Sequence, residues 1–149
     1  MTFYEDDRVQ SLHDVFDILP GQVNVTYQRK AGQVVAWHKH NIQTDYWCVV
    51  RGSFRVGICC PSHMYMDNAR KVFDKNGDEY LLRWEYLSDK NFRTIRIEPG
   101  YYHGYMPLED DSIMLYYLDQ KFNPDDQFKI APGHFGETWD RDWETFPTE

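Results

Sequence analysis

Two histidines in the segment 32–52 carry the clearest potential for chemistry. His38 and His40 are separated by one residue in a stretch that the sequence predicts to be a β-strand. Strand side chains alternate between the two faces of a sheet, so both imidazoles should project toward the same volume. Histidine gains or loses a proton near neutral pH and can serve as a general base. We therefore predict an active site on this face, with a solvent-exposed sheet edge as the alternative.

The elements that position these histidines are predicted to be strands separated by turns. Besides the two strands of segment 32–52, further strands are expected at 22–28, 53–60, 80–87, 93–97 and 113–118. The pair Asn76-Gly77 favours a tight hairpin turn before the third of these. Short strands at regular intervals, without a convincing long helix, predict an all-β fold, namely an antiparallel β-barrel or jelly roll with little helix.

The chain length predicts one domain. A sequence of 149 residues is long enough for a single well-buried core. Within it we expect an N-terminal arm over 1–21, which is either a short helix or irregular, a barrel over 22–122, and an irregular C-terminal tail over 123–149. A barrel of this kind holds its ligand inside.

The composition indicates which binding partners and which cellular compartment to expect. The net charge of −8 argues against nucleic acid as a partner, because phosphate backbones repel a negatively charged protein. The three cysteines lack the spacing of a zinc ribbon or a disulfide framework. No apolar run approaches the roughly 20 residues of a membrane span, and the start lacks the features of a signal peptide. We expect a reduced, cytoplasmic protein with no membrane partner.

The segment 32–52 resembles the first cupin signature, in which a glycine is followed by His-x-His, an acidic residue and a closing glycine. His38 and His40 form the pair, and Asp45 stands at the acidic position. The stretch Pro99–His103 is similar to the second signature in keeping Gly-x-x-His. This resemblance implies a cupin-type barrel in which both segments donate histidines to one cavity.

Within the cupins, the chain resembles the dTDP-4-dehydrorhamnose 3,5-epimerases and the dTDP-sugar 3,4-ketoisomerases. The stretch Ile97–Tyr105 is similar to the epimerases' proline-glycine-aromatic-x-His-Gly-aromatic motif, and Tyr116 follows at the family's distance. His38 occupies the position of their general base and Tyr116 that of their acid. Asp45 departs from the epimerase pattern, which has a lysine there.

The resemblance implies an isomerase that acts on a nucleotide-linked 4-keto-sugar. Such a reaction needs a base to remove the proton beside the ketone, a group to stabilise the enolate, and an acid to return the proton. We expect His38 as the base and Tyr116 or His40 as the acid, with no cofactor. The residues expected to bind substrate are Tyr27, Arg29, His103, Arg8 and Arg55. The family also implies a homodimer.

Two alternatives use the same residues differently. His38, His40, His103 and Asp45 offer three ring nitrogens and a carboxylate, a set that would hold a divalent transition metal in a metal-dependent cupin enzyme. A non-catalytic barrel that binds a sugar is the second alternative. His103 follows a Pro-Gly turn, so it could instead tie that corner to a backbone carbonyl.

Overall fold

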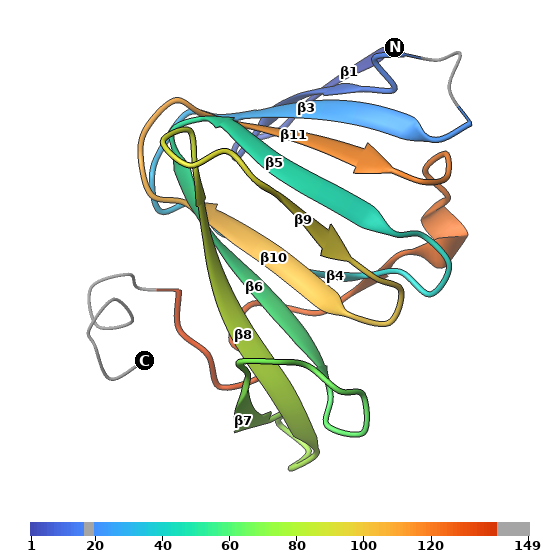
Figure 1. Cartoon of the computed structure of the whole chain (residues 1–149), viewed down its shortest axis with the longest axis vertical. Helices are drawn as coiled ribbons and strands as arrows, with labels where there is room; N and C mark the ends of the chain where they lie inside the picture. The colour runs from blue at the N-terminus through green and yellow to red at the C-terminus, as the bar shows by residue number, and fades with distance from the viewer. Residues whose placement is uncertain (17–19, 140–149) are drawn as a thin grey trace.

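The structure, a computed structural model, describes residues 1–16 and 20–139 and consists of two six-stranded antiparallel sheets (Figure 1). The first sheet has the strand order β1 (Thr2–Glu5), β2 (Gln10–His13), β3 (Gln22–Gln28), β11 (Ser112–Leu118), β5 (Asp45–Arg51), β9 (Thr94–Ile97). The second has the order β12 (Phe128–Lys129), β4 (Val35–Lys39), β10 (Tyr102–Pro107), β6 (Ser53–Pro61), β8 (Glu79–Ser88), β7 (Arg70–Phe73). The one helical element in the described ranges is a 3-10 turn, η1 (Pro124–Asp126). The all-β prediction is confirmed, and the topology is a cupin-type jelly roll.

The turn chemistry read from the sequence explains the β7–β8 hairpin. Asn76-Gly77 lies in the loop between these strands, and Gly77 has a φ of +83°, which glycine adopts without steric cost. The Asp74 carboxylate accepts hydrogen bonds from the backbone N–H groups of Asn76 and Asp78, which closes the loop. The hairpin prediction is therefore confirmed.

The N-terminal segment differs from the expected helix or irregular arm. β1 and β2 form an antiparallel hairpin, and β2 pairs with β3, so this segment extends the first sheet. Val9 and Ser11 are buried while Leu12 is exposed, which is the two-residue period of a strand. Val9 and Leu12 are three residues apart, as on one face of a helix, but one is buried and the other exposed. Residues 17–19 of the predicted arm lie outside the described part.

Strand β6 separates two apolar cores. Phe54 and Val56 point between the two sheets, where they are fully buried. Cys59 points to the opposite side of the second sheet and packs with Trp37 and Trp139. The second sheet therefore has an apolar layer on both faces, which requires a cover on the side away from the first sheet.

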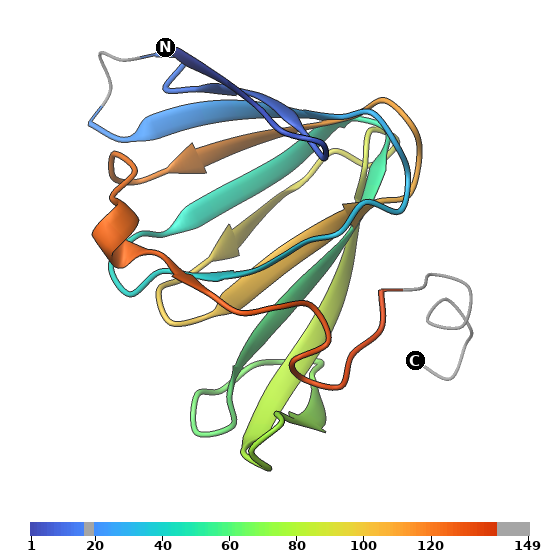
Figure 2. The ribbon, with the colours of Figure 1, turned by 180° about the vertical axis from the view of Figure 1, so that it is seen from behind.

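The C-terminal segment supplies that cover. After η1, β12 pairs with β4, and the chain continues to residue 139 across the face of the second sheet that points away from the first, toward the viewer in Figure 2. The buried Glu137 carboxylate holds the end of this segment by accepting hydrogen bonds from the backbone N–H groups of Gly133 and Phe135 and from Trp139 Nε1. Although little of the tail is regular structure, its described part is packed into the fold.

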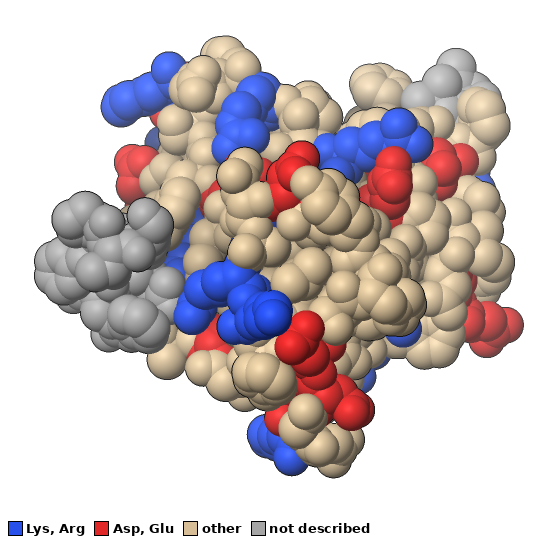
Figure 3. Space-filling model, turned by 60° about the horizontal axis from the view of Figure 1, so that its bottom comes forward, with Lys and Arg blue, Asp and Glu red and all other residues tan. Residues whose placement is uncertain are grey.

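Charged side chains of both signs are distributed over the surface. On the face shown in Figure 3, Lys and Arg side chains lie interspersed with Asp and Glu among uncharged residues. Within the described ranges, no helix is long and apolar enough to cross a membrane.

Candidate active site

A cavity of about 420 Å³ lies between the two sheets, a size suited to a small-molecule ligand. The first sheet and its hairpin contribute Tyr4, Arg8, Ser11, His13, Asn24, Thr26, Asp45, Trp47, Met114 and Tyr116. The second sheet and the loop after β4 contribute Val35, His38, His40, His103, Tyr105 and Lys129. The walls thus combine a few apolar side chains with many hydrogen-bonding groups.

A local irregularity of β4 aims its histidine into the cavity. His38 lies directly opposite His103 on β10, but the next pair is Val35 with Tyr105, so the pairing steps by three residues on β4 and by two on β10. Such a bulge changes which side chains share a face. Val35 and His38 therefore both face the cavity, while Trp37 between them packs in the outer core.

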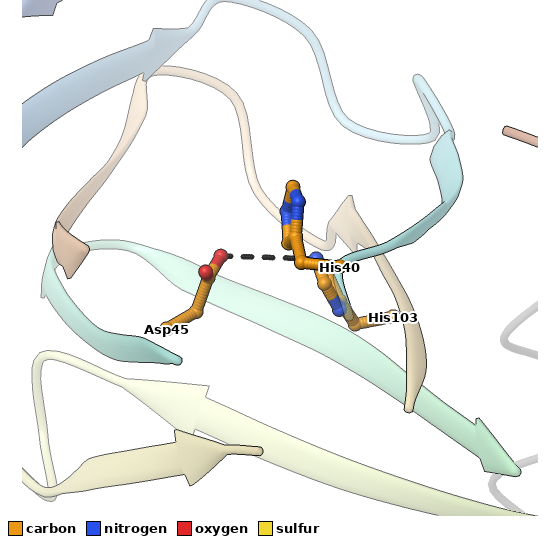
Figure 4. Close-up of side chains that lie close together, drawn as sticks. All are labelled: His40, Asp45 and His103. Carbon is orange, nitrogen blue, oxygen red and sulfur yellow. Dashed lines mark ion pairs between the residues drawn. The ribbon is translucent and has the colours of Figure 1, made fainter. Parts of the chain in front are cut away.

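Three buried side chains that line the cavity lie close together (Figure 4). One potential ligand atom from each of His40, Asp45 and His103 lies within 4.8 Å of the others. The two imidazole centroids are 5.3 Å apart, and His103 Nε2 lies 3.7 Å from an Asp45 carboxylate oxygen. All three residues are at least 94% buried, with exposed fractions of 6%, 3% and 4%.

Backbone carbonyls fix the orientation of both rings. His40 Nδ1 lies 2.8 Å from the carbonyl oxygen of Asp126, and His103 Nδ1 lies 3.1 Å from that of Tyr101. A carbonyl oxygen can only accept a hydrogen bond, so each Nδ1 carries the proton. Whenever such a ring is neutral, its Nε2 presents a lone pair. His103 does tie its corner to a carbonyl, and that contact also directs its other nitrogen toward Asp45.

Burial controls the protonation of this cluster. Burial lowers the pKa of His103 to about 3, so the ring is neutral at pH 7 and its contact with Asp45 is not an ion pair. Burial also raises the pKa of Asp45, against the opposing effect of hydrogen bonds from the Gln43 amide at 2.6 Å and the Trp47 indole at 3.2 Å. The cluster is therefore a buried site in which His103 is neutral and the Asp45 carboxyl group is harder to ionise than a free one.

The donor set of this cluster fits a divalent transition metal. Two imidazole nitrogens and one carboxylate oxygen are common ligands for such ions. Metal-binding histidines typically donate their other N–H to a carbonyl or carboxylate, as His40 and His103 do here. His38, the fourth ligand expected from the sequence, does not belong to this group, and its ring centroid is 6.5 Å from that of His103.

His38 and Tyr116 line the cavity from different sheets. His38 is on β4 of the second sheet and Tyr116 is on β11 of the first. Burial lowers the pKa of His38 to about 3, with further contributions from His103, Lys129, His40 and Arg8. Burial raises the pKa of Tyr116, whose hydroxyl accepts a hydrogen bond from the Thr26 hydroxyl at 3.4 Å. At pH 7 the imidazole is unprotonated and the phenol is protonated.

Three residues expected to bind substrate lie outside the cavity. Tyr27 projects from the outer face of β3, where its hydroxyl donates to the Asp111 carboxylate, because the even-numbered residues of that strand face inward. Arg29 is exposed and pairs with Glu5 at 3.1 Å. Arg55 is fully buried on the far side of the second sheet, because its β6 neighbours Phe54 and Val56 fill the side between the sheets.

Contacts of Arg55 explain why an arginine is buried there. Its guanidinium carbon lies 3.5 Å from the centroid of the Trp84 ring, and Nη1 donates a hydrogen bond to the Thr138 carbonyl at 3.3 Å. Arg55 therefore helps to hold the C-terminal segment. Arg8, in contrast, lines the cavity as expected for a substrate-binding residue, and pairs with Asp6 at 3.0 Å.

Several cavity residues were not found by sequence reasoning. The inward face of β3 carries Gln22, Asn24 and Thr26, and all three side chains are buried. A row of polar residues at every second position was the available signal, since such a row cannot pack in an apolar core. Lys129 on β12 and His13 on β2 also line the cavity. They lie in segments without strand periodicity, so no comparable signal pointed to them.

Comparisons with known proteins place this architecture among the cupins. No protein-family model matches the chain. A dTDP-4-dehydrorhamnose 3,5-epimerase of Mycolicibacterium smegmatis is 34% identical over 53 residues, which are 36% of this chain and 26% of that protein. The chain therefore spans about a quarter of the curated relative that it matches.

Solved structures share the fold over most of the chain. CapF of Staphylococcus aureus matches with a TM-score of 0.63 and 19% identity over 87% of this chain and 31% of CapF. A dTDP-4-dehydrorhamnose 3,5-epimerase of Bacillus anthracis matches with a TM-score of 0.57 and 21% identity over 85% of this chain and 63% of that one. A dTDP sugar isomerase of Desulfovibrio desulfuricans matches with a TM-score of 0.61 and 15% identity over 93% and 86%.

These matches define the fold. The chain has a cupin fold, as the two histidine-bearing segments indicated. The fold is related to that of dTDP-4-dehydrorhamnose 3,5-epimerase and dTDP sugar isomerase structures, and the sequence similarity to the epimerases is distant.

Proposed function

We propose that the protein is an isomerase that epimerises or keto-isomerises a nucleotide-linked 4-keto-sugar. The observation that carries the proposal is that His38 and Tyr116 line one cavity from opposite sheets. Inversion at a carbon next to a ketone needs a base on one face of the sugar ring and an acid on the other. The distant similarity to a 3,5-epimerase supports the same reaction class.

The protonation states suit this division of roles. A neutral His38 can accept a proton, and a Tyr116 hydroxyl whose pKa is raised by burial keeps its proton available. His38 takes the proton from the carbon beside the ketone, the C–H electron pair forms the enolate C=C bond, and the carbonyl pair moves to oxygen. As the C=O bond re-forms, Tyr116 donates a proton to that carbon from the other face. Proton transfer from imidazolium to phenolate through solvent then restores both groups.

The rest of the cavity suits a sugar nucleotide. The amides of Gln22 and Asn24 and the Thr26 hydroxyl can hydrogen-bond sugar hydroxyl groups, and Arg8 supplies a positive charge for a diphosphate. The Bacillus anthracis epimerase structure contains TDP and PPi, which supports a nucleotide diphosphate as part of the ligand. We place the sugar between His38 and Tyr116, and His40 and His103 as polar neighbours.

Deuterium wash-in tests the proposal. The protein is incubated in heavy water with a dTDP-4-keto-sugar, and deuterium at the carbons next to the ketone is measured by NMR or mass spectrometry. We expect enzyme-dependent exchange in the wild-type protein. The rate of product formation should fall by about two to four orders of magnitude in His38→Asn and in Tyr116→Phe. Absence of exchange in the wild-type protein would contradict the function.

Matched variants control for general damage. His63 is exposed on a loop and Tyr117 points away from the cavity on the same strand as Tyr116, so His63→Asn and Tyr117→Phe should keep the wild-type rate. Binding of dTDP measured by calorimetry separates a sugar-binding barrel, which binds without exchange, from an isomerase.

Metal binding is the second candidate function, favoured by the orientation of His40 and His103 around Asp45. A metal held by these three groups would supply a Lewis acid in the cavity. Elemental analysis of protein purified without added metal tests this candidate. A stoichiometric transition metal that is lost in His40→Ala and His103→Ala, but retained in His63→Ala, would support it, and a metal-free active protein would contradict it.

Three further expectations remain predictions. A homodimer follows from the resemblance to the epimerases, and light scattering of the purified protein measures it. A single domain over 1–149 is tested by limited proteolysis, which should cut no linker inside 22–122. Fluorescent tagging in cells tests the cytoplasmic location.

A further inference from the structure

The proposed reaction needs a positive group close to the oxygen on which negative charge develops. Preorganised donors or cations at that oxygen usually make the largest contribution to lowering the barrier. At the position where the epimerases have a lysine, β5 presents Asp45 instead. A carboxylate cannot stabilise an enolate, so the charge must come from another element.

Two basic residues line the cavity among the described residues, Arg8 and Lys129. Arg8 comes from the loop between β1 and β2, its guanidinium is held 3.0 Å from the Asp6 carboxylate, and it is assigned above to the diphosphate. Lys129 makes no ion pair with any carboxylate in the part of the chain that the structure describes. Lys129 is thus the cavity cation whose charge remains available.

Strand pairing places Lys129 beside the proposed base. β12 pairs with β4 in antiparallel register, and Lys129 lies directly opposite His38. Side chains of directly opposed residues project from the same face, with Cβ atoms about 5 Å apart. Both residues line the cavity, and the charge of Lys129 contributes to the lowered pKa of His38. The flexible lysine side chain can therefore reach an atom bonded to the carbon that His38 deprotonates.

The neighbouring residue pair between β12 and β4 shows that only one of the lysines on these strands faces the cavity. Lys39 lies opposite Phe128, one residue along from the first pair, and therefore on the other face. Its ammonium nitrogen lies 5.0 Å from the centroid of the Tyr102 ring and 5.3 Å from that of the Phe128 ring. Lys129 therefore faces the cavity, whereas Lys39 packs against aromatic rings on the other face of the sheet.

We propose that Lys129 is the catalytic residue that stabilises the enolate oxygen, a role that rests on the isomerase function proposed above. Its ammonium group donates a hydrogen bond to the carbonyl oxygen without transferring the proton. When the proton moves from carbon to His38, the electron pair that arrives on this oxygen meets a fixed positive charge. Lys129 is exposed in the free protein, and a bound sugar nucleotide covers it, which strengthens the interaction by excluding water.

Kinetics of Lys129→Met test the role, with Lys129→Arg as the charge-conserving variant. We expect the kcat for deuterium wash-in to fall about a hundredfold in Lys129→Met and to recover partly in Lys129→Arg. Binding of dTDP, which has no ketone, should change by less than about threefold. Lys39→Met removes the same charge outside the cavity, and its kcat should equal that of the wild type. Thermal unfolding checks that all variants are folded.

The outcomes separate this inference from the proposed function. A wild-type protein without wash-in would contradict the isomerase function and with it the role of Lys129. An active wild type with an equally active Lys129→Met would overturn the inference alone. Weaker dTDP binding with unchanged kcat would also overturn it, because Lys129 would then contact the diphosphate. An equal loss in Lys39→Met would show an effect of net charge rather than of position.

Discussion

Replacing Asp126 with alanine should destabilise the protein and loosen the cavity at the same point. Asp126 is buried in η1, and its carboxylate accepts hydrogen bonds from three consecutive backbone N–H groups, those of Asn41 at 2.8 Å, Ile42 at 3.2 Å and Gln43 at 3.1 Å. These residues form the loop that joins the histidine strand to β5. One carboxylate thus holds the whole turn between two strands of the site.

The magnitude follows from the exposure of the three donors. Asn41 and Ile42 are exposed, so water can replace the lost acceptor at a cost of about 1 kcal/mol each, whereas Gln43 is buried and its unsatisfied N–H costs about 2 kcal/mol. The free energy of unfolding of Asp126→Ala should therefore fall by about 4 kcal/mol. Asp126→Asn keeps one acceptor oxygen and should lose about half as much.

Urea denaturation measures the loss, and Asp125→Ala is the matched control. Asp125 is in the same 3-10 turn but exposed, so its replacement removes one negative charge and should cost less than about 0.5 kcal/mol. Hydrogen exchange adds a local measurement, because the amides of 41–43 should lose protection in Asp126→Ala while those of β6 keep theirs. A loss below about 1 kcal/mol, or unchanged protection at 41–43, would refute the reasoning.

Three other measurements test further parts of the structure. Glu137→Ala should lower the free energy of unfolding by about 3 kcal/mol, because three hydrogen-bond donors lose their acceptor, and a cost near zero in urea denaturation would contradict its role. Burial raises the pKa of Asp6, but hydrogen bonds from a neighbouring arginine lower it to about 2 overall, so the stability advantage over Asp6→Asn should persist above pH 4 and vanish as the pH falls toward 2. Thermal unfolding across that pH range measures the difference in stability between the wild type and Asp6→Asn. A difference that does not change with pH would contradict the lowered pKa of Asp6. Cys48 should be the one thiol of the three that a disulfide reagent modifies in the native protein. Burial raises the pKa of the Cys60 thiol to about 11 and that of the Cys59 thiol further, so neither should react quickly. Fast labelling of a second thiol would contradict this prediction.

Strand positions were predictable because their signals are local. The alternation of apolar and polar residues over 22–28 and the Asn76-Gly77 turn each depend on a few neighbouring residues. The structure has a strand and a turn at these positions, as predicted. His38 and His40 line one cavity, as the two-residue period predicts, although β4 has a bulge and His40 lies just beyond its end. Local chemistry thus accounts for the strands and for much of the histidine-bearing wall.

Features that depend on distant partners were not predictable. Adjacent acidic residues such as Asp125 and Asp126 are usually solvated, yet Asp126 is buried because the loop 41–43 comes to it from more than 80 residues away. Tyr27 was expected inside and lies outside, because the opposing sheet covers the face of β3 that carries Gln22, Asn24 and Thr26. Lys129 could not be found, since β12 is a strand only because β4 is its neighbour.

The pairing of β4 with both β10 and β12 sets the order in which the protein can be completed during synthesis. The histidine strand leaves the ribosome early, but both of its neighbours come from the last third of the chain. A nascent chain that ends before residue 102 therefore holds His38, the proposed base, on an unpaired strand, with apolar surface exposed to aggregation. We expect such chains to depend on chaperones, and ligand to bind after translation rather than during it.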